Sequence, residues 1–232
     1  MMDLQVIYED NHLIAVNKPA GMLVQGDETG DTPISEHIKK YIKDRYKKPG
    51  DVFLGTIHRI DRPVSGAVVF ARTSKALERM NALFLEQKVE KTYWAVVAER
   101  PNPLEGTLVH FLVKDKDKNI TRALDGQSRR YPDAKRSELS YQLICSMGDH
   151  HLLEVLPKTG RSHQIRAQLM RIDCPIRGDL KYGFPKANKD LSIHLHCKQM
   201  KFIHPVLKTA ISIDADPPTT DPIWREFAKS LL

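Results

Sequence analysis

Short runs rich in β-branched and aromatic residues recur along the chain and are separated by clusters of turn-forming residues. Such runs are typical of β-strands. The predicted strands cover residues 6–9, 13–17, 67–72, 92–98, 107–113, 138–144, 152–156, 191–196 and 210–213. The pattern therefore predicts a protein built mainly around a sheet.

Helix start signals are few by comparison. Thr32 and Pro33 have the residue types of an N-cap and a first helical position, and Ser74 is suited to cap a second helix. Asp221 followed by Pro222 predicts a third helix at the C-terminal end. Because few, irregularly placed helices interrupt many strands, we expect an α+β fold with a mostly antiparallel sheet rather than a βαβ winding.

A further helix is expected to begin in the basic segment 159–170. Ile165 and Leu169 have the spacing of a core-facing stripe, and His163 and Arg166 share a neighbouring stripe. The free amides and the dipole of a helix N-terminus attract anions such as a phosphate or a carboxylate. Taken alone, the segment could equally be a solvated basic helix end.

Residues 58–66 read HRIDRPVSG and enclose one carboxylate, Asp61, between Arg59 and Arg62. Nearby positive charge favours the ionised form of an aspartate. An ionised carboxylate suits a nucleophile or a base better than a proton donor. The alternative is that Asp61 only anchors the two arginines at the surface.

Together, segments 58–66 and 159–166 resemble the RluA-type family of RNA pseudouridine synthases, with its HRLDxxTSG and TGRxHQIR motifs. Further matches are NKPAG at 17–21, KTY at 91–93, IRGDLKYG at 176–183, LSIHLH at 191–196 and HP at 204–205. Val64 and Cys197 depart from the family's usual threonine and alanine, and residues 114–131 match no family motif. The resemblance spans about residues 4 to 218.

The resemblance implies a pseudouridine synthase fold, in which a long mixed, mostly antiparallel sheet surrounds a central catalytic cleft. We expect residues 1–232 to form a single catalytic domain with two closely joined halves. Because few residues precede the NKPAG motif, the chain is expected to be a short form that lacks the family's frequent N-terminal RNA-binding domain.

The resemblance also implies the chemistry, which is the isomerisation of uridine to pseudouridine in ribosomal or transfer RNA. The N-glycosidic bond breaks and the uracil rejoins the ribose through carbon 5, so neither a redox change nor a cofactor is expected. Asp61 takes the role of nucleophile or base, and covalent carboxylate catalysis has precedent in glycosyl chemistry. The family motif places Arg166 as the partner of this acid and Tyr93 as the ring that stacks on the target uracil. His58 is expected to brace the loop.

The target uridine must leave the RNA stack before it can react. Arg59 occupies the family position that fills the vacated place. Other side chains expected to contact RNA are Lys18, Arg62, Arg161, His163, Arg129 and Arg130. The last two lie in the unmatched segment 114–131, for which a solvated loop and an RNA grip are equally good interpretations.

Composition agrees with an RNA partner. The chain has 232 residues, a net charge of +7 and a pI of about 9.2, and such a balance favours polyanions. Three irregularly spaced cysteines do not make a disulfide framework. No signal peptide and no membrane-spanning apolar run is recognisable. We therefore expect a cytoplasmic protein that neither associates with a membrane nor needs an obligate protein partner.

Two alternatives belong to other classes. A metal-dependent hydrolase or nuclease could use His58, Asp61, His194 and His196, although such spacings are common by chance. A non-catalytic RNA-binding module is the other, and the joint presence of Asp61, Tyr93 and Arg166 argues against it. The sequence therefore favours a metal-free isomerase.

Overall fold

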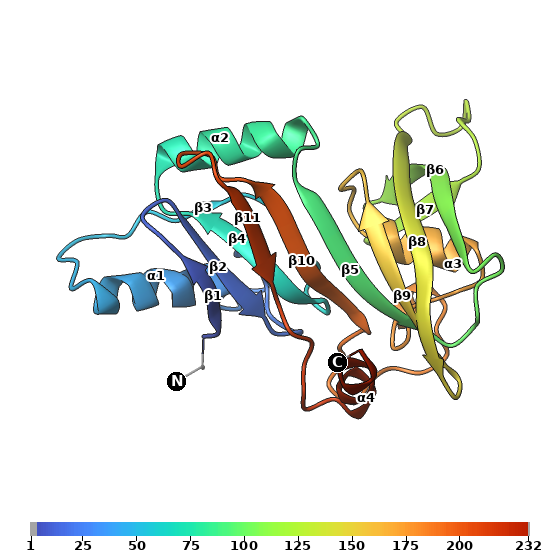
Figure 1. The fold of residues 1–232 in the computed structure, drawn as a ribbon. Helices are drawn as coiled ribbons and strands as arrows, with labels where there is room; N and C mark the ends of the chain where they lie inside the picture. The colour runs from blue at the N-terminus through green and yellow to red at the C-terminus, as the bar shows by residue number, and fades with distance from the viewer. Residues whose placement is uncertain (1–3, 232) are drawn as a thin grey trace. The chain divides into compact units, whose positions relative to one another are not determined.

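The computed structural model describes residues 4–231, which divide into two compact units. Unit 1 consists of residues up to Lys91 together with Cys197–Thr220, and unit 2 consists of Thr92–His196 and Asp221 onward. In the described chain there are eleven strands, four α-helices and one short 3-10 helix (Figure 1). Each unit is thus assembled from two separate stretches of the sequence.

Unit 1 contains four neighbouring strands in the order β1-β2-β4-β10. These are β1 (Val6–Glu9), β2 (Leu13–Lys18), β4 (Ser65–Ala71) and β10 (Leu195–Ile203), while β3 (Gly55–Thr56) pairs with β4 and β11 (Ala210–Asp214) pairs with β10. All seven residues of β4 are buried. Helix α1 (Ile34–Arg45) buries Ile34, Ile38 and Ile42, and α2 (Ser74–Leu85) buries Ala76 and Met80. The core therefore centres on β4.

Unit 2 has the strand order β5-β9-β8-β6-β7, and all of its registered pairs are antiparallel. The elements are β5 (Glu90–Val97), β6 (Glu105–Asp115), β7 (Ile120–Leu124), β8 (Lys135–Met147), β9 (His150–Pro157), α3 (Gln164–Arg171), the 3-10 helix η1 (Leu180–Tyr182) and α4 (Pro222–Ser230). Residues paired across antiparallel strands lie on the same face. This register defines two faces, and each receives one helix.

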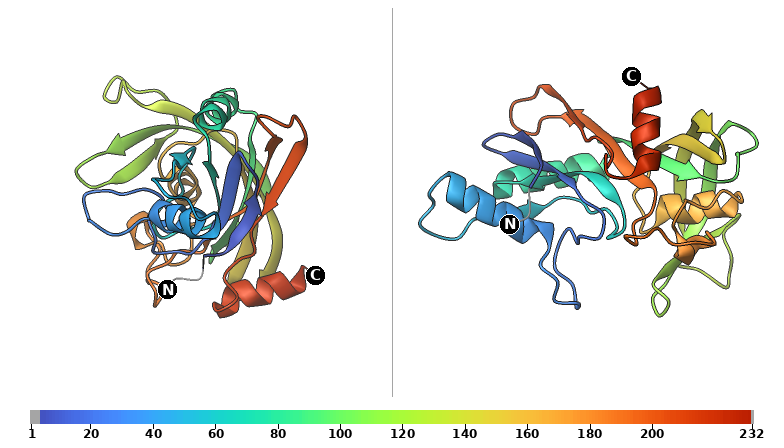
Figure 2. Two further views of the ribbon diagram at one scale, coloured as in Figure 1. Left: turned by 90° about the vertical axis from the view of Figure 1, so that its left-hand side faces the viewer. Right: turned by 90° about the horizontal axis from the view of Figure 1, so that it is seen from below.

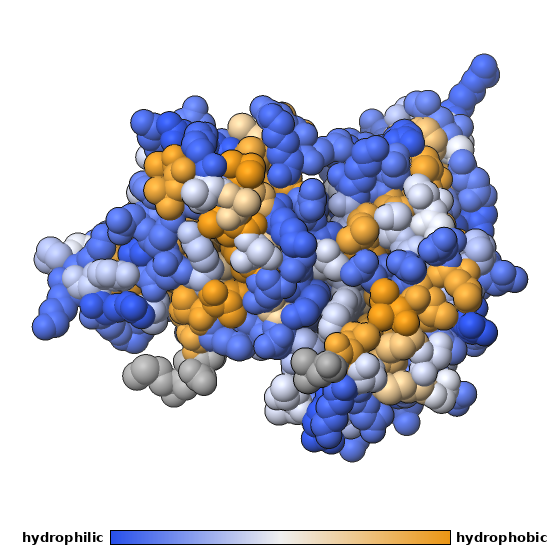
Figure 3. Space-filling view, viewed as in Figure 1, coloured by the Kyte–Doolittle hydropathy of each residue, from blue (hydrophilic) through white to orange (hydrophobic). Residues whose placement is uncertain are grey.

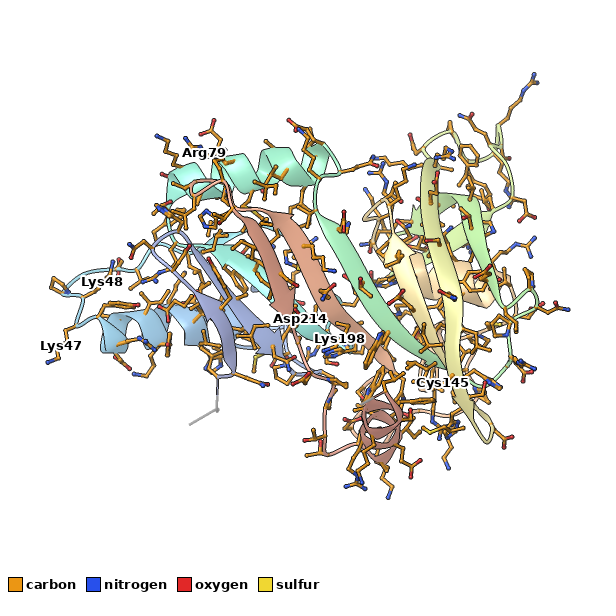
Figure 4. The ribbon with its side chains drawn as sticks, viewed as in Figure 1. Lys47, Lys48, Arg79, Cys145, Lys198 and Asp214 are labelled. Atoms are coloured by element: carbon orange, nitrogen blue, oxygen red, sulfur yellow. The ribbon has the colours of Figure 1, made fainter. Side chains whose placement is uncertain are left out.

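Helices α3 and α4 cover opposite faces of this sheet (Figure 2). Ala167 of α3 packs with Leu112 of β6 on one face. On the other face, Trp224 and Phe227 of α4 pack with Val96 and Leu152. Figure 4 labels Cys145, which belongs to the α4 side and packs against this cluster. We call the face that carries α3 the α3 face.

Most of the predicted elements are confirmed, including the α+β class with a mostly antiparallel sheet. The Asp221 cap is confirmed, because its carboxylate accepts the N–H of Trp224 at 2.9 Å. The other two helices begin as predicted to within one residue, but Thr73 rather than Ser74 caps α2, and Pro33 rather than Thr32 occupies the N-cap of α1. The central cleft and the close joining of the halves stay predictions.

Two predictions about secondary structure are wrong. The strand expected at 191–196 begins only at Leu195 and continues to Ile203, because Leu191 adopts a left-handed conformation with φ of 59° that ends any extended run. Residues 114–131 are not a continuous solvated loop, since β6 extends into them and Ile120–Leu124 forms β7. None of the four α-helices in residues 4–231 is long and apolar enough to span a membrane.

Candidate active site

The loop that carries Asp61 is fixed to the segment after β2. The backbone N–H of Gly21 donates to the carbonyl of Arg62 at 2.8 Å, and Arg62 Nε donates to the carbonyl of Gly21 at 2.9 Å. The N–H of Val64 closes a turn by donating to the Asp61 carbonyl at 3.0 Å. Ile60 and Val64, on either side of the acid, are buried. Asp61 therefore sits in a tightly held turn and is itself only partly exposed.

Lys18 is the buried centre of this arrangement. Its ammonium donates to the carbonyls of Pro19, Met22 and Arg62 at 2.9, 2.8 and 3.3 Å, and the residue is 0% exposed. Burial lowers the pKa of Lys18 to about 7, although the negative charge of Asp61 opposes this shift. The prediction that Lys18 contacts RNA is therefore wrong, because its three donors are occupied inside the protein.

Gly66 ends the loop where β4 meets β10. Its φ of 118° is unfavourable for residues with a side chain, and an added Cβ would lie 2.4 Å from the carbonyl oxygen of Cys197. The strands can approach this closely only with glycine at this position. Cys197 stands where the family usually has alanine, but its contact with Gly66 involves the backbone of Cys197 and not its thiol.

His58 braces the opposite end of the loop. Its Nε2 accepts the backbone N–H of Val69 at 3.0 Å, and its ring stacks on Phe84 with centroids 5.2 Å apart. Burial, and to a lesser degree the charge of Lys91, lowers the pKa of His58 to about 3. A neutral imidazole with Nε2 as acceptor cannot serve as a proton donor from that nitrogen. The expected bracing role agrees with this geometry.

This pKa shift predicts a pH dependence of stability. The folded state keeps His58 neutral while the unfolded chain takes up a proton near pH 6.5, so its stabilising contribution is complete above pH 6.5 and is lost as pH falls toward 3. We expect this group to cost up to about 2 kcal/mol of unfolding free energy at pH 5. Urea unfolding at pH 7 and pH 5 should show a smaller difference for His58→Gln than for the wild type; equal differences would contradict the expectation.

The two arginines that flank Asp61 differ in their contacts. Arg62 forms an ion pair with Asp31, Nη2 to Oδ2 at 2.7 Å, in addition to its bond to Gly21. Its guanidinium thus ties the loop to the 27–31 turn. Arg59 is exposed, as a residue expected to enter an RNA stack must be. Its contact with RNA stays a prediction.

In unit 2 the predicted TGRSHQIR segment forms a turn followed by α3. His163 takes the N-cap position with φ of 52°, and Arg161 is exposed. Gln164 holds the turn, since its Oε1 accepts from the Thr159 hydroxyl at 2.7 Å and from the Arg161 N–H at 3.0 Å. Its Nε2 donates to the carbonyl of Glu138 on β8 at 3.1 Å. Sequence reasoning had given Gln164 no role.

Arg166 lies buried on α3 and forms a bidentate ion pair with Asp179. Nε donates to Oδ2 at 2.6 Å and Nη2 donates to Oδ1 at 2.8 Å, while the two side chains are 5% and 1% exposed. The guanidinium also lies over the ring of Tyr182, 4.8 Å from its centroid. Asp179 follows Gly178, whose φ of 85° and lack of a Cβ permit a close approach to Asn188. The predicted pairing of Arg166 with Asp61 stays a prediction.

Tyr93 lies on β5 opposite Val155 of β9, which in turn is opposite Tyr141 of β8. This row belongs to the α3 face of the sheet, the face on which Arg166 is carried. Within unit 2, the structure therefore brings the predicted stacking tyrosine and the predicted arginine to the same side. Arg129 and Arg130 instead occupy the exposed loop between β7 and β8.

The proposed metal ligands have other functions. His194 receives a hydrogen-bond contact from Asn188 at Nδ1, 3.0 Å, and lies 3.2 Å from Asp221 at Nε2. His196 packs near Trp224, with ring centroids 5.9 Å apart. No group of three or more His, Cys, Asp or Glu side chains with metal-binding geometry occurs within residues 4–231. The histidines thus anchor α4, and the hydrolase alternative is not supported.

Comparison with known proteins identifies the family. Residues 12–171 match the family model described as RNA pseudouridylate synthase. The tRNA pseudouridine synthase C of Vibrio parahaemolyticus is 31% identical over 97% of this chain and 94% of its own length. A ribosomal large subunit pseudouridine synthase C of Buchnera aphidicola is 30% identical over 91% of this chain and 66% of its own length.

A solved structure agrees with these matches. Human RNA Pseudouridylate Synthase Domain Containing 4 superposes with a TM-score of 0.78 and 25% identity, covering 98% of this chain and 91% of that one. The resemblance inferred from the motifs is thereby confirmed. The chain belongs to the RNA pseudouridylate synthase family, the enzymes that isomerise uridine to pseudouridine in RNA.

Proposed function

We propose that this enzyme modifies a uridine of transfer RNA and uses Asp61 as nucleophile or base. The observation that carries the choice of RNA is the length of its relatives. The tRNA enzyme of Vibrio parahaemolyticus and this chain cover each other almost completely, whereas the Buchnera ribosomal enzyme is longer than the matched region. The match to the tRNA enzyme thus extends over nearly all of both sequences, and the match to the ribosomal enzyme does not.

The assignment of Asp61 is supported by its setting. Three hydrogen bonds hold the turn that carries this carboxylate. The N–H of Val64 closes the turn, Arg62 Nε donates to the carbonyl of Gly21, and the buried Lys18 donates to the carbonyl of Arg62. Catalysis by a positioned group gains from such restraint, because less freedom is lost when the substrate binds. We assign Arg59, at the edge of the same loop, to the space left by the flipped nucleotide.

Tyr93 and Arg166 complete the proposed catalytic set. Tyr93 stacks on the target uracil and assists in moving the carbon 5 proton, and Arg166 holds Asp61 ionised and oriented. The support is their family motifs and their place on the α3 face of unit 2. The rigid bidentate pair with Asp179 limits the rotation of the Arg166 guanidinium.

RNA contacts outside the reacting nucleotide are assigned to the strands and loops around β7. Residues 111–136 contain eight basic and four acidic side chains, a net charge of +4 out of +7 for the whole chain. Figure 3 shows hydrophilic atoms over the projecting end of unit 2, where Figure 1 places the loop between β7 and β8. Arg161 and His163 contribute from the turn before α3. We also propose that the enzyme works in the cytoplasm without an obligate protein partner.

One experiment tests the substrate. The purified protein is incubated with an unmodified bulk tRNA transcript pool and, separately, with ribosomal RNA fragments, and pseudouridine is located by carbodiimide labelling and primer extension. We expect a new stop in tRNA alone. Modification of the ribosomal fragments alone would overturn the choice of RNA, and modification of neither would overturn the proposed substrate class.

The loop between β7 and β8 makes a separate prediction. If Arg129 and Arg130 contact phosphates, replacing both by glutamine should lower the slope of log affinity against log salt by up to about two. The Michaelis constant should rise while the rate on saturating RNA changes little. The matched control is Lys47→Gln with Lys48→Gln, two adjacent exposed basic residues beyond α1 (Figure 4). Equal slopes for the wild type and the Arg129/Arg130 variant would show that the loop is solvated and makes no phosphate contacts.

A further inference from the structure

Tyr182 lies at a junction of three elements in unit 2. It is 4% exposed, belongs to η1, and contacts β7 and the start of α3 through its hydroxyl. The backbone N–H of Thr121 donates to this hydroxyl at 2.7 Å, and Nδ1 of His163 lies 2.8 Å from it. Thr121 is the donor in the first contact, and the tautomer of His163 sets which partner donates in the second. One oxygen thus holds two separate segments.

The ring of the same residue supports Arg166. The guanidinium carbon stands 4.8 Å from the ring centroid, and His163 meets the ring edge on, with centroids 5.7 Å apart. A cation over an aromatic face is attracted by the ring quadrupole, most strongly where water is excluded. Asp179, three residues earlier, accepts hydrogen bonds from Nε and Nη2 of the guanidinium. Arg166 is therefore fixed at its edge by Asp179 and on its face by Tyr182.

The hairpin of β6 and β7 is fastened to the same place by two more bonds. The hydroxyl of Thr121 donates to the carbonyl of Ser162 at 2.9 Å, and Lys181 Nζ donates to the carbonyl of Asn119 at 3.2 Å. Leu112, Ala167 and Tyr182 also form one buried cluster. The side chain of Tyr182 therefore contacts both the basic hairpin and Arg166.

We infer that Tyr182 is a positioning residue. It fixes Arg166 for the isomerisation and holds it at a set position relative to the hairpin of β6 and β7. The inference rests on the proposed role of Arg166 and extends it to a residue that acts through it. Loss of the hydroxyl leaves the ring in place but frees both the β7 amide and His163. The rate of the chemical step should then fall while RNA affinity is kept, because the charges that contact RNA are unchanged.

The test compares Tyr182→Phe with Tyr141→Phe. Tyr141 is a matched control, since it is 5% exposed and its hydroxyl donates to the carbonyl of Pro103 at 3.0 Å. Tyr182→Phe leaves the buried N–H of Thr121 unpaired, whereas Tyr141→Phe frees the carbonyl of Pro103, an exposed residue, so Tyr182→Phe should lower stability more, and kcat is compared under conditions where both variants are folded. We expect kcat to fall about tenfold in Tyr182→Phe, a change of about 1.4 kcal/mol, and less than twofold in Tyr141→Phe. The dissociation constant for RNA should change less than twofold in either.

A double-mutant comparison identifies the route. If Tyr182 acts through Arg166, Tyr182→Phe should lower kcat much less in an Arg166→Lys background than in the wild type. Full additivity, an equal kcat loss in both tyrosine variants, or a loss confined to RNA affinity would each overturn the inference. A wild-type protein that makes no pseudouridine would instead overturn the proposed function, so the two failures are distinguishable.

Discussion

Asp61→Asn should bind substrate RNA as the wild type does and lose isomerase activity by more than about a thousandfold. The amide keeps the size and most of the hydrogen-bonding geometry of the carboxylate but removes its charge and its nucleophilicity. The turn that carries it should persist, because it is closed by the backbone of residue 61 and not by its side chain. Single-turnover assays on tRNA, with binding measured separately, distinguish chemistry from affinity.

The control is Asp31→Asn, which removes the carboxylate that pairs with Arg62 and leaves Asp61 unchanged. That ion pair is largely exposed, so its loss should change turnover only a few-fold. An Asp61→Asn enzyme that forms pseudouridine at near wild-type rate would end the assignment. A variant that no longer binds RNA would show that the residue is needed for the complex rather than for the reaction.

Arg166→Met should abolish measurable turnover and also destabilise unit 2. The change leaves Asp179 buried and without its bidentate partner, and breaking such a pair by removing one side costs about 3–5 kcal/mol. Arg166→Lys keeps the charge but not the two parallel bonds, so we expect a folded protein with a strongly reduced kcat. Urea unfolding and saturated rates measure the two effects separately.

The double variant Arg166→Met with Asp179→Leu distinguishes structure from chemistry. Replacing both members of a buried ion pair by apolar groups often restores stability, because no uncompensated charge remains. We expect much of the lost unfolding free energy to return while activity stays absent. Recovered activity would show that Arg166 serves only the fold, and unrecovered stability would show that the site cannot accept an apolar pair.

The sequence predicted those elements whose signals are local. The cap at Asp221, the buried apolar face of α1 and the seven-residue core strand β4 each follow from residues close together in the chain. The strand assigned to 191–196 failed because Asn188 and Asp190 hold Ser192 in a turn, and these short polar side chains compete with a strand. Strand β7 was missed because charged residues on both sides obscure five residues that pair with β6.

The motifs identified the region of the site but not its internal contacts. Lys18 looked like one more basic residue, and only the fold reveals three carbonyls gathered around its ammonium. Asp179 lies thirteen residues from Arg166 and carried no signal of their pairing beyond its place in the motif. Such contacts depend on tertiary structure, since no spacing rule links a helix to a turn that follows it at that distance.

The division of the sequence between the two units has a consequence for synthesis on the ribosome. Unit 1 needs residues 197–220 for β10 and β11, and unit 2 needs α4, which begins at Pro222. Neither unit can therefore finish folding until nearly the whole chain has left the exit tunnel. Although domains usually fold one after another during translation, here a nascent chain stalled at residue 190 should hold a unit 1 sheet without β10 and β11 and a unit 2 sheet without α4 on its face, and both units should remain sensitive to protease.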